Sequence, residues 1–167
     1  SSRISKQKPL NSIHVTHIFF NLQRNHLRKA LFTGFGQVAK EEQVRQYMQK
    51  GKEIAGKHIE IFSTLLLNNN LPVSMAWESG VTDSKIAPFS DLLMLQEVRS
   101  MNVILAANYA KAISISGDKQ DLAGDFARLM AEILKHTGEG LNLLVNNGWY
   151  EEPPQAEEPG APVNTVH

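Results

Sequence analysis

The chain has 167 residues, 17 basic against 17 acidic side chains, six histidines and no cysteine. This length predicts one domain that can bury a hydrophobic core. The lack of cysteine excludes disulfides, thiolate zinc sites and cysteine nucleophiles. A formal net charge of zero argues against nucleic acid or an anionic membrane as the partner. No apolar run is long enough for a transmembrane helix, and none follows the basic first residues as in a signal peptide, so we expect a cytoplasmic location rather than export.

Four long segments show the spacing of apolar residues that is typical of helices. The expected helices lie at about 11–36, 41–70, 90–117 and 118–148. Gly34 and Gly36 favour a break at the end of the first helix, and Gly148 is expected to end the fourth. No segment shows the hairpin pattern of strands, so the sequence predicts an all-α fold.

The first helix is expected to bury one apolar stripe that includes a histidine. The members of this stripe are Ile13, His17, Phe20, Leu27 and Leu31. The second and fourth helices carry similar stripes, which include His58 and His136. Three histidines therefore fall on faces that we expect to be buried.

The segment between the second and third helices, residues 71–89, is too long and irregular for a tight turn. It predicts a crossover like that of ferritin-like bundles, which would run the second and third helices parallel, whereas a shorter path would make them antiparallel. A shift of 78 residues places His58 on His136, the pattern that a duplicated helical hairpin would leave. We therefore predict one ferritin-like four-helix bundle at residues 1–150. Residues 151–167 hold four Glu and four Pro and are expected to form an extended or disordered tail.

Histidines that point into a helical bundle can hold a divalent transition metal. The candidate ligands are His17, His58 and His136, and Glu132 or Asp125 would complete the set. In the other interpretation, each histidine is a core residue that hydrogen-bonds to a hydroxyl, a carbonyl or water. The sequence leaves both interpretations open.

A di-iron carboxylate centre is not expected in this bundle. Such centres need a Glu from each of two helices and a Glu-x-x-His from each of the other two. Ala55 and Ile133 stand three residues before His58 and His136, and residues 1–40 contain no acidic side chain. The sequence also lacks a phosphate-binding glycine loop and a Gly-x-Ser-x-Gly nucleophile motif. We therefore expect a protein that is not an enzyme.

The first 40 residues hold seven basic side chains and no acidic one. Arg24, Arg28 and Lys29, together with His26, are expected to form a basic band on the exposed side of the first helix. This band would face acidic helices of the same protein, or the acidic face or tail of another copy. Nucleic-acid binding would need a denser patch with interleaved aromatic residues.

Five strings stand out when the whole chain is read. They are GKEIAGKHIEIF (51–62), NLPV (70–73), WESGVT (77–82), PFSD (88–91) and GWYEEPPQ (148–155). Together they resemble a family of uncharacterised proteins from spore-forming Gram-positive bacteria that is similar to spore coat proteins of the coat protein F type. The resemblance covers about residues 12–156. It implies a ferritin-like bundle and supplies no established activity and no catalytic residues.

Many members of that family resemble two such bundles in tandem, whereas this chain has one, so self-association is expected to replace the missing copy. The expected function is that of a non-enzymatic structural or interaction protein in the cytoplasm or the spore coat. Its expected partners are further copies of itself or other coat proteins. The alternatives are a metal-binding bundle that uses the histidines, and a small-ligand pocket between the helices or under the loop around Trp77.

Overall fold

The computed structural model describes residues 9–73, 89–151 and 160, and these residues form a bundle of α-helices. The helices are α1 (Ser12–Val38), α2 (Glu42–Asn68), α3 (Asp91–Ile115) and α4 (Gln120–Asn146). The predicted all-α four-helix bundle is thereby confirmed. The loop around Trp77 and nearly all of the predicted tail lie outside the described residues. No described helix combines the length and the apolar character that a membrane span requires.

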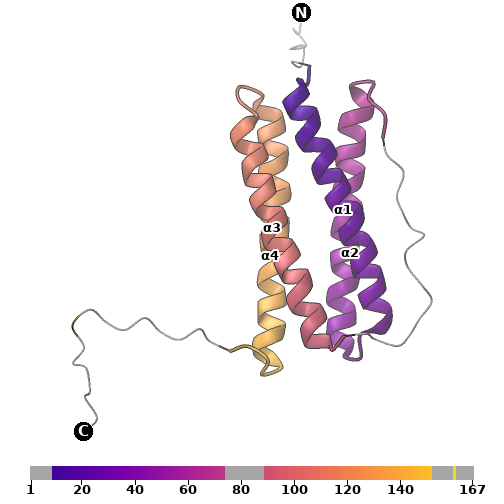
Figure 1. Cartoon of the computed structure of the whole chain (residues 1–167), viewed down its shortest axis with the longest axis vertical. Coiled ribbons are helices and arrows are strands. Elements are labelled where there is room, and N and C mark those ends of the chain that lie inside the picture. The colour runs from indigo at the N-terminus through magenta and orange to yellow at the C-terminus, as the bar shows by residue number, and fades with distance from the viewer. Residues whose placement is uncertain (1–8, 74–88, 152–159, 161–167) are drawn as a thin grey trace, which may run out of the picture.

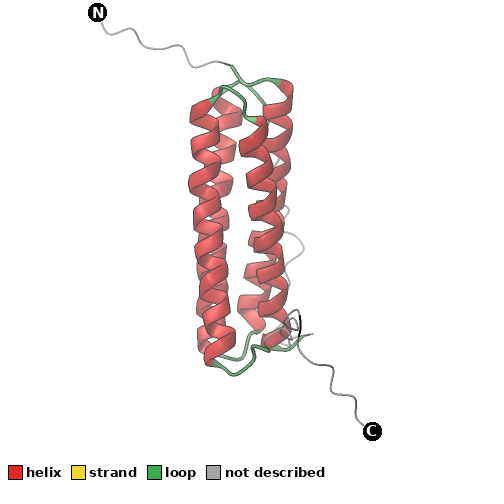
Figure 2. Ribbon diagram, turned by 90° about the vertical axis from the view of Figure 1, so that its left-hand side faces the viewer, coloured by secondary structure: helices red, strands yellow, loops and turns green. Residues whose placement is uncertain are grey.

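The helices form two antiparallel hairpins, α1 with α2 and α3 with α4, which pack side by side (Figure 1). In addition, α1 packs against α3 and α2 against α4. Because α2 ends at one end of the bundle and α3 begins at the other, these two helices run in the same direction (Figure 1). This is the parallel arrangement of a ferritin-like crossover. Seen from the side, all four helices extend along the bundle, and loops at its ends join α1 to α2 and α3 to α4 (Figure 2).

Asp91 fixes the start of α3 beside the turn between α1 and α2. Its carboxylate accepts hydrogen bonds from the backbone N–H groups of Lys40 (2.9 Å) and Glu41 (2.7 Å). The preceding residue, Ser90, caps α3, because its hydroxyl accepts a hydrogen bond from the N–H of Leu93 at 3.2 Å. The end of the PFSD string therefore both starts a helix and ties that helix to the other hairpin.

The sequence predicts a break at Gly34 and Gly36. This prediction is wrong, because the first helix continues to Val38. Gly36 lies where α1 approaches α2, and a Cβ there would be 3.4 Å from the Cβ of Met48. Packing against a neighbouring helix outweighs the low helix propensity of glycine, which costs about 1 kcal/mol relative to alanine. The prediction for Gly148 is confirmed, since this residue follows α4 with φ +69°.

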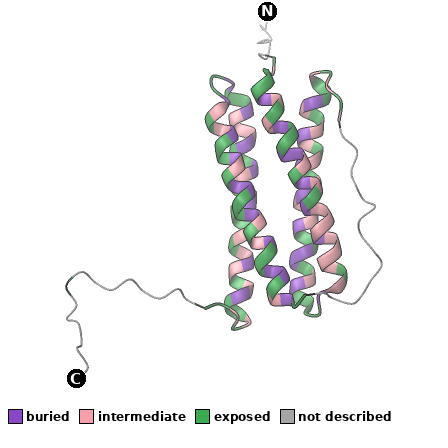
Figure 3. Cartoon of the chain, in the orientation of Figure 1, coloured by how far each residue is buried: buried purple, intermediate pink, exposed green. Residues whose placement is uncertain are grey.

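Buried residues recur along every helix (Figure 3). They gather in two apolar clusters. One cluster lies toward the α3–α4 turn around Phe62 and Phe126, and the other lies toward the α1–α2 turn around Phe32 and Met48. The core is thus divided along the bundle axis.

The buried face of α1 differs from the predicted stripe. Ile13, Phe20 and Leu27 are 56%, 41% and 52% exposed, and His17 is half-buried. The residues that pack inward are His14, Ile18, Asn21, Leu22, Asn25, Arg28 and Phe32. The prediction was wrong because it assumed that the more apolar face of a helix turns inward, whereas α1 buries polar side chains. On α2 and α4 the predicted faces are buried, with both of their histidines.

Candidate functional site

A layer of polar side chains crosses the bundle between the two apolar clusters, and all four helices contribute to it. Its members are Asn25 and Arg28 of α1, Tyr47 and His58 of α2, Asn102 and Tyr109 of α3, and His136 of α4. None of these residues is more than 5% exposed. Polar groups buried in this way need hydrogen-bond partners inside the protein. We call this set the polar layer.

Arg28 lies at the centre of the polar layer. Its Nη1 donates to Oδ1 of Asn25 at 2.8 Å, and its Nη2 donates to Oδ1 of Asn102 at 2.7 Å. The guanidinium carbon also lies 5.3 Å from the centre of the Phe32 ring. Burial lowers the pKa of Arg28 to about 10, so the side chain stays protonated at neutral pH. Among the described residues, no carboxylate forms an ion pair with this charge.

His58 extends the layer from α3 to the bundle surface. The hydroxyl of Tyr109 accepts a hydrogen bond from Nδ2 of Asn25 and lies 2.8 Å from Nδ1 of His58. Since the Tyr109 oxygen already accepts, we assign its proton to the bond with Nδ1. Nε2 of His58 then carries the other proton and donates to Oε2 of Glu132 at 3.2 Å. Glu132 is also paired with Lys57 at 2.5 Å, on the partly exposed side of α4.

His136 occupies the other side of the layer. Its Nδ1 accepts from Nδ2 of Asn102 at 2.9 Å, so Nε2 carries the proton and donates to the backbone carbonyl of Tyr47 at 3.2 Å. The hydroxyl of Tyr47 donates to the backbone carbonyl of His136 at 2.7 Å. The two rings are stacked, with centroids 4.0 Å apart. His136 therefore joins α4 to both α2 and α3.

Both histidines of the polar layer are neutral at physiological pH. Burial lowers the pKa of His58 to about 4, although the hydrogen bond and charge of Glu132 act in the opposite direction. Burial likewise lowers the pKa of His136 to about 4. The charge of Arg28 lowers both values further. The layer thus holds one fixed positive charge and two neutral imidazoles.

Of the candidate metal ligands, His58 and Glu132 meet, but His136 lies apart from them. The ion pairs Lys57–Glu132 and Lys50–Glu139 set the register of α2 against α4. With a rise of 1.5 Å per residue, this register separates His58 from His136 by roughly 7 Å along the bundle axis. Because of this offset, His58 hydrogen-bonds to Tyr109 and Glu132, whereas His136 hydrogen-bonds to other groups.

The remaining candidates lie elsewhere. His17 is half-buried on α1, where burial, Lys111 and His14 together lower its pKa. Asp125 is paired with Arg128 on its own helix. In the part of the chain that the structure describes, no group of three or more His, Asp or Glu side chains is placed to hold a metal ion.

Most residues of the polar layer are not among those that the sequence predicts to be functional. Arg28 was assigned to an exposed basic band, but it is 2% exposed, so that assignment is wrong. The physical reason is that Asn25 and Asn102 supply amide oxygens for its guanidinium. One signal was available, since Asn21, Asn25 and Arg28 recur at helical spacing and continue to Phe32.

The apolar residues of α1 that were expected inside lie instead on the surface, next to α3. Arg24 and Leu27 of α1 line one pocket with Met101 and Ile104 of α3. Helical spacing adds Phe20 and Leu31 of α1 and Glu97 of α3 to the same side, and we call this set the α1–α3 face. Leu27 and Ile104 are 52% and 54% exposed. The guanidinium of Arg24 lies over the Phe20 ring, 4.9 Å from its centre. The face therefore combines exposed apolar groups with one charge of each sign.

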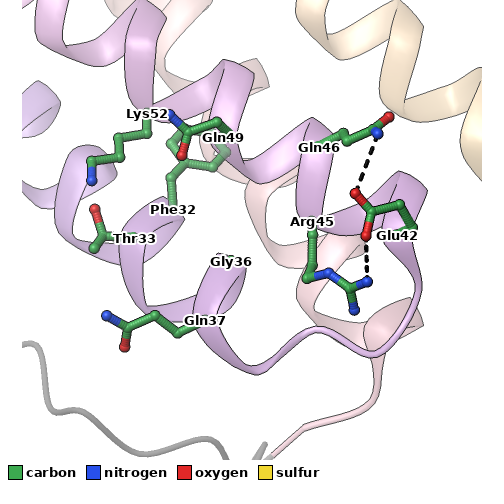
Figure 4. A pocket seen from close by; sticks show the side chains of 9 residues that line it. All are labelled: Phe32, Thr33, Gly36, Gln37, Glu42, Arg45, Gln46, Gln49 and Lys52. Carbon is green, nitrogen blue, oxygen red and sulfur yellow. Dashed lines mark hydrogen bonds and ion pairs between the residues drawn. The ribbon is translucent and has the colours of Figure 1, made fainter.

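A groove of about 450 Å³ lies between the end of α1 and the start of α2 (Figure 4). Its lining includes the side chain of Phe32 and polar side chains such as Gln37, Gln49 and Lys52. Glu42 lies at one side and is joined to Arg45 and Gln46 (Figure 4). These polar side chains are mostly exposed, and the groove brings together no catalytic or metal-binding set of residues.

Residues 1–161 match the family described as a protein of unknown function, DUF3231. The chain belongs to this family. No curated protein matches the sequence of this DUF3231 member. Among solved structures, its fold matches that of a protein from Bacillus halodurans that is provisionally described as a spore coat protein. The TM-score is 0.80 with 17% sequence identity, and the match covers 90% of this chain and 98% of the other. At this identity the likeness establishes the shared bundle.

Proposed function

We propose that this DUF3231 protein is a non-enzymatic structural protein of the spore coat type, and that it assembles with further copies through its α1–α3 face. The fold that it shares with a protein provisionally described as a spore coat protein supports the first part. The resemblance of its strings to coat proteins points the same way. The exposed apolar groups of the α1–α3 face support the second part, and they are the observation that carries the proposal.

The polar layer supports a structural role rather than catalysis. Its side chains are at most 5% exposed, and they hydrogen-bond mainly to one another. Polar groups that hydrogen-bond to one another in a core favour one arrangement of the helices over others. The layer therefore holds the two hairpins in register.

The α1–α3 face suits an interface because it places apolar side chains in water. Leu27 and Ile104 are each more than half exposed, and Phe20 is 41% exposed. Contiguous apolar surface of this kind marks interaction sites in soluble proteins. Since apolar contact drives association, a partner that covers this face would gain free energy from burying it.

A second copy of the chain is the partner that the charges favour. Arg24 and Asn108 line the same pocket, and Glu97 lies three helical turns before Asn108 on α3. Arg24 and Glu97 thus lie toward opposite ends of the face. A two-fold axis through the middle of the face would bring Arg24 of each copy to Glu97 of the other, and such self-complementarity is what a symmetric dimer requires.

The test is sedimentation velocity of the intact protein from low to high micromolar concentrations. The variant Leu27→Gln removes an apolar group from the α1–α3 face, and Leu134→Gln is its control on α4, because the two leucines are 52% and 51% exposed. We expect the dimer dissociation constant to rise about tenfold or more in Leu27→Gln only. A strictly monomeric wild-type protein would refute the assembly.

Metal binding by the histidines is the second candidate, and the pairing of His58 with Glu132 is the observation that favours it. Against it, Arg28 places a positive charge in the same layer, and this charge opposes a cation. Metal analysis of protein purified without a histidine tag tests this alternative. A stoichiometric transition metal that is lost in His58→Gln would establish it.

A further inference from the structure

Arg28 is a full positive charge in the middle of the bundle, and no side chain in the described part of the protein forms an ion pair with it. The residue is 2% exposed, and its two terminal nitrogens donate to the neutral amide oxygens of Asn25 and Asn102. Its third donor, Nε, is buried and has no hydrogen-bond partner among the described residues. The guanidinium therefore has unused capacity to bind an anion.

Burying a charge without a counter-charge is costly. The desolvation penalty is large, and neutral partners offset only part of it. The face of Phe32 and the two amide oxygens stabilise the guanidinium through dipoles, but they do not neutralise it. A bound anion close to Arg28 would remove much of this penalty.

A small pocket between α1 and α3 offers a place for such an anion. Its volume is about 50 Å³. The pocket is lined by Arg24, Leu27, Arg28, Met101, Ile104, Leu105 and Asn108. Two of these side chains are cationic, and the amide of Asn108 adds N–H donors, while the rest of the lining is apolar. None of the lining residues is acidic.

The size of the pocket limits what it can hold. One water molecule takes about 30 Å³ in the liquid, so the pocket has room for one small ion with at most one water molecule beside it. A nucleotide or a phosphorylated peptide is too large. A chloride-sized ion fits, and an apolar wall beside arginine and amide donors suits a weakly hydrated monovalent anion better than a divalent one.

We propose that the pocket between α1 and α3 binds one small monovalent inorganic anion of the chloride class, held by Arg28 with Arg24 and Asn108. This site lies within a single chain, so the monomer alone is expected to bind the anion, although Arg24, Leu27, Met101 and Ile104 also belong to the α1–α3 face. Its consequence is that the bundle is more stable in the presence of such an anion. Binding to the folded state alone raises stability in a saturable way.

The experiment measures thermal unfolding of the intact protein while chloride replaces gluconate at constant ionic strength. We expect the midpoint Tm to rise by a few degrees and then to saturate, because a site fills, whereas general screening does not saturate in this way. Broadening of the chloride-35 NMR line by the protein gives a second readout. The same Tm shift at two protein concentrations separates the site from self-association.

Two variants sharpen the result. Asn108→Asp puts a carboxylate into the pocket, so we expect it to raise Tm in gluconate and to abolish both the chloride response and the line broadening. Asn142→Asp makes the same chemical change at an exposed position of α4 and should keep the full response. Because Asn108→Asp retains Arg28, the test does not depend on whether an Arg28 variant folds.

Either of two outcomes overturns the proposal. One is a Tm that is equal in chloride and gluconate at every concentration. The other is a full chloride response in Asn108→Asp.

Discussion

Arg28 of α1 and Asn102 of α3 are joined by a 2.7 Å hydrogen bond from Nη2 to the amide oxygen. The same amide donates to Nδ1 of His136 on α4. One asparagine thus connects the first hairpin to both helices of the second. This contact is one of several that tie the two hairpins together, beside those of Asp91 and the ion pairs between α2 and α4.

Replacing Asn102 with leucine removes both hydrogen bonds and leaves Arg28 and His136 with buried unpaired atoms. We expect the free energy of unfolding in urea to fall by about 3 kcal/mol, because each unsatisfied buried group costs about 1–3 kcal/mol. The exposed Asn142→Ala on α4 is the control and should change stability by less than about 0.5 kcal/mol. In the double variant Arg28→Met/Asn102→Leu, part of the loss should return, since no buried charge remains. Simple additivity of the two changes would contradict this account.

The two buried histidines predict that stability depends on pH. The pKa values of His58 and His136 are lowered by burial to about 4 in the folded protein, whereas an unfolded histidine has a pKa of about 6.5. Between these values the unfolded chain binds more protons, so stability is full above about pH 6.5 and falls as the pH drops toward 4. Each histidine adds a slope of up to about 1.4 kcal/mol per pH unit.

Urea unfolding at a series of pH values measures this slope. His58→Gln and His136→Gln should each reduce the slope of stability against pH by the contribution of one histidine. The double variant should reduce it by the contribution of both. The carboxylate of Glu132 loses its contribution only at lower pH: burial raises its pKa, but hydrogen bonds from Lys57 and His58 lower it overall. An unchanged slope in the double variant would show that other groups cause the dependence.

Gly51 of α2 is predicted to resist substitution by alanine. A Cβ at this position would overlap the ring of Phe32 on α1. We expect Gly51→Ala to cost about 1–3 kcal/mol, because a well-packed core must shift to accept a methyl group. Gly56 lies in the same helix with open space around it, so Gly56→Ala should instead stabilise by up to about 1 kcal/mol. Thermal unfolding of the two variants compares them directly, and a stabilised Gly51→Ala would be the wrong sign.

Asp91 is predicted to be important for docking the two hairpins. Its carboxylate accepts from the N–H groups of Lys40 and Glu41, at the turn between α1 and α2. Hydrogen bonds to a charged group contribute about 1.5–3 kcal/mol, so Asp91→Ala should lower the free energy of unfolding by about 2 kcal/mol. Asp121→Ala is the control, because Asp121 lies in the first turn of α4 and is half exposed. If both variants lose the same free energy of unfolding, Asp91 acts only through the favourable effect of a negative charge at a helix N-terminus.

The proposed dimer predicts a charge-reversal pattern on the α1–α3 face. Arg24→Glu and Glu97→Arg should each weaken association, because each brings like charges together. The double reversal Arg24→Glu/Glu97→Arg should restore much of the affinity in sedimentation velocity. A double variant that associates no better than the single ones would exclude the two-fold arrangement, even if the protein forms dimers by another face.

The sequence by itself determined the four helices, the buried faces of α2 and α4, and the resemblance to the family. These features depend on local spacing. His58 and His136 lie in runs where nearly every third or fourth residue is apolar, so their burial follows from periodicity. The length of residues 71–89 also indicated a crossover.

Tertiary structure alone decided which face of α1 is buried, the direction of α3 and the hydrogen-bond partners of each buried histidine. Arg28 is buried because Asn102, 74 residues further along the chain, supplies an acceptor for it. The residues around an arginine on a helix do not reveal a partner so far along the chain. A prediction from the sequence therefore assigns Arg28 to the exposed surface. For the same reason the apolar stripe of Phe20 and Leu27, which periodicity assigns to the core, lies outside. The polar layer that replaces this stripe exists only once four helices have met.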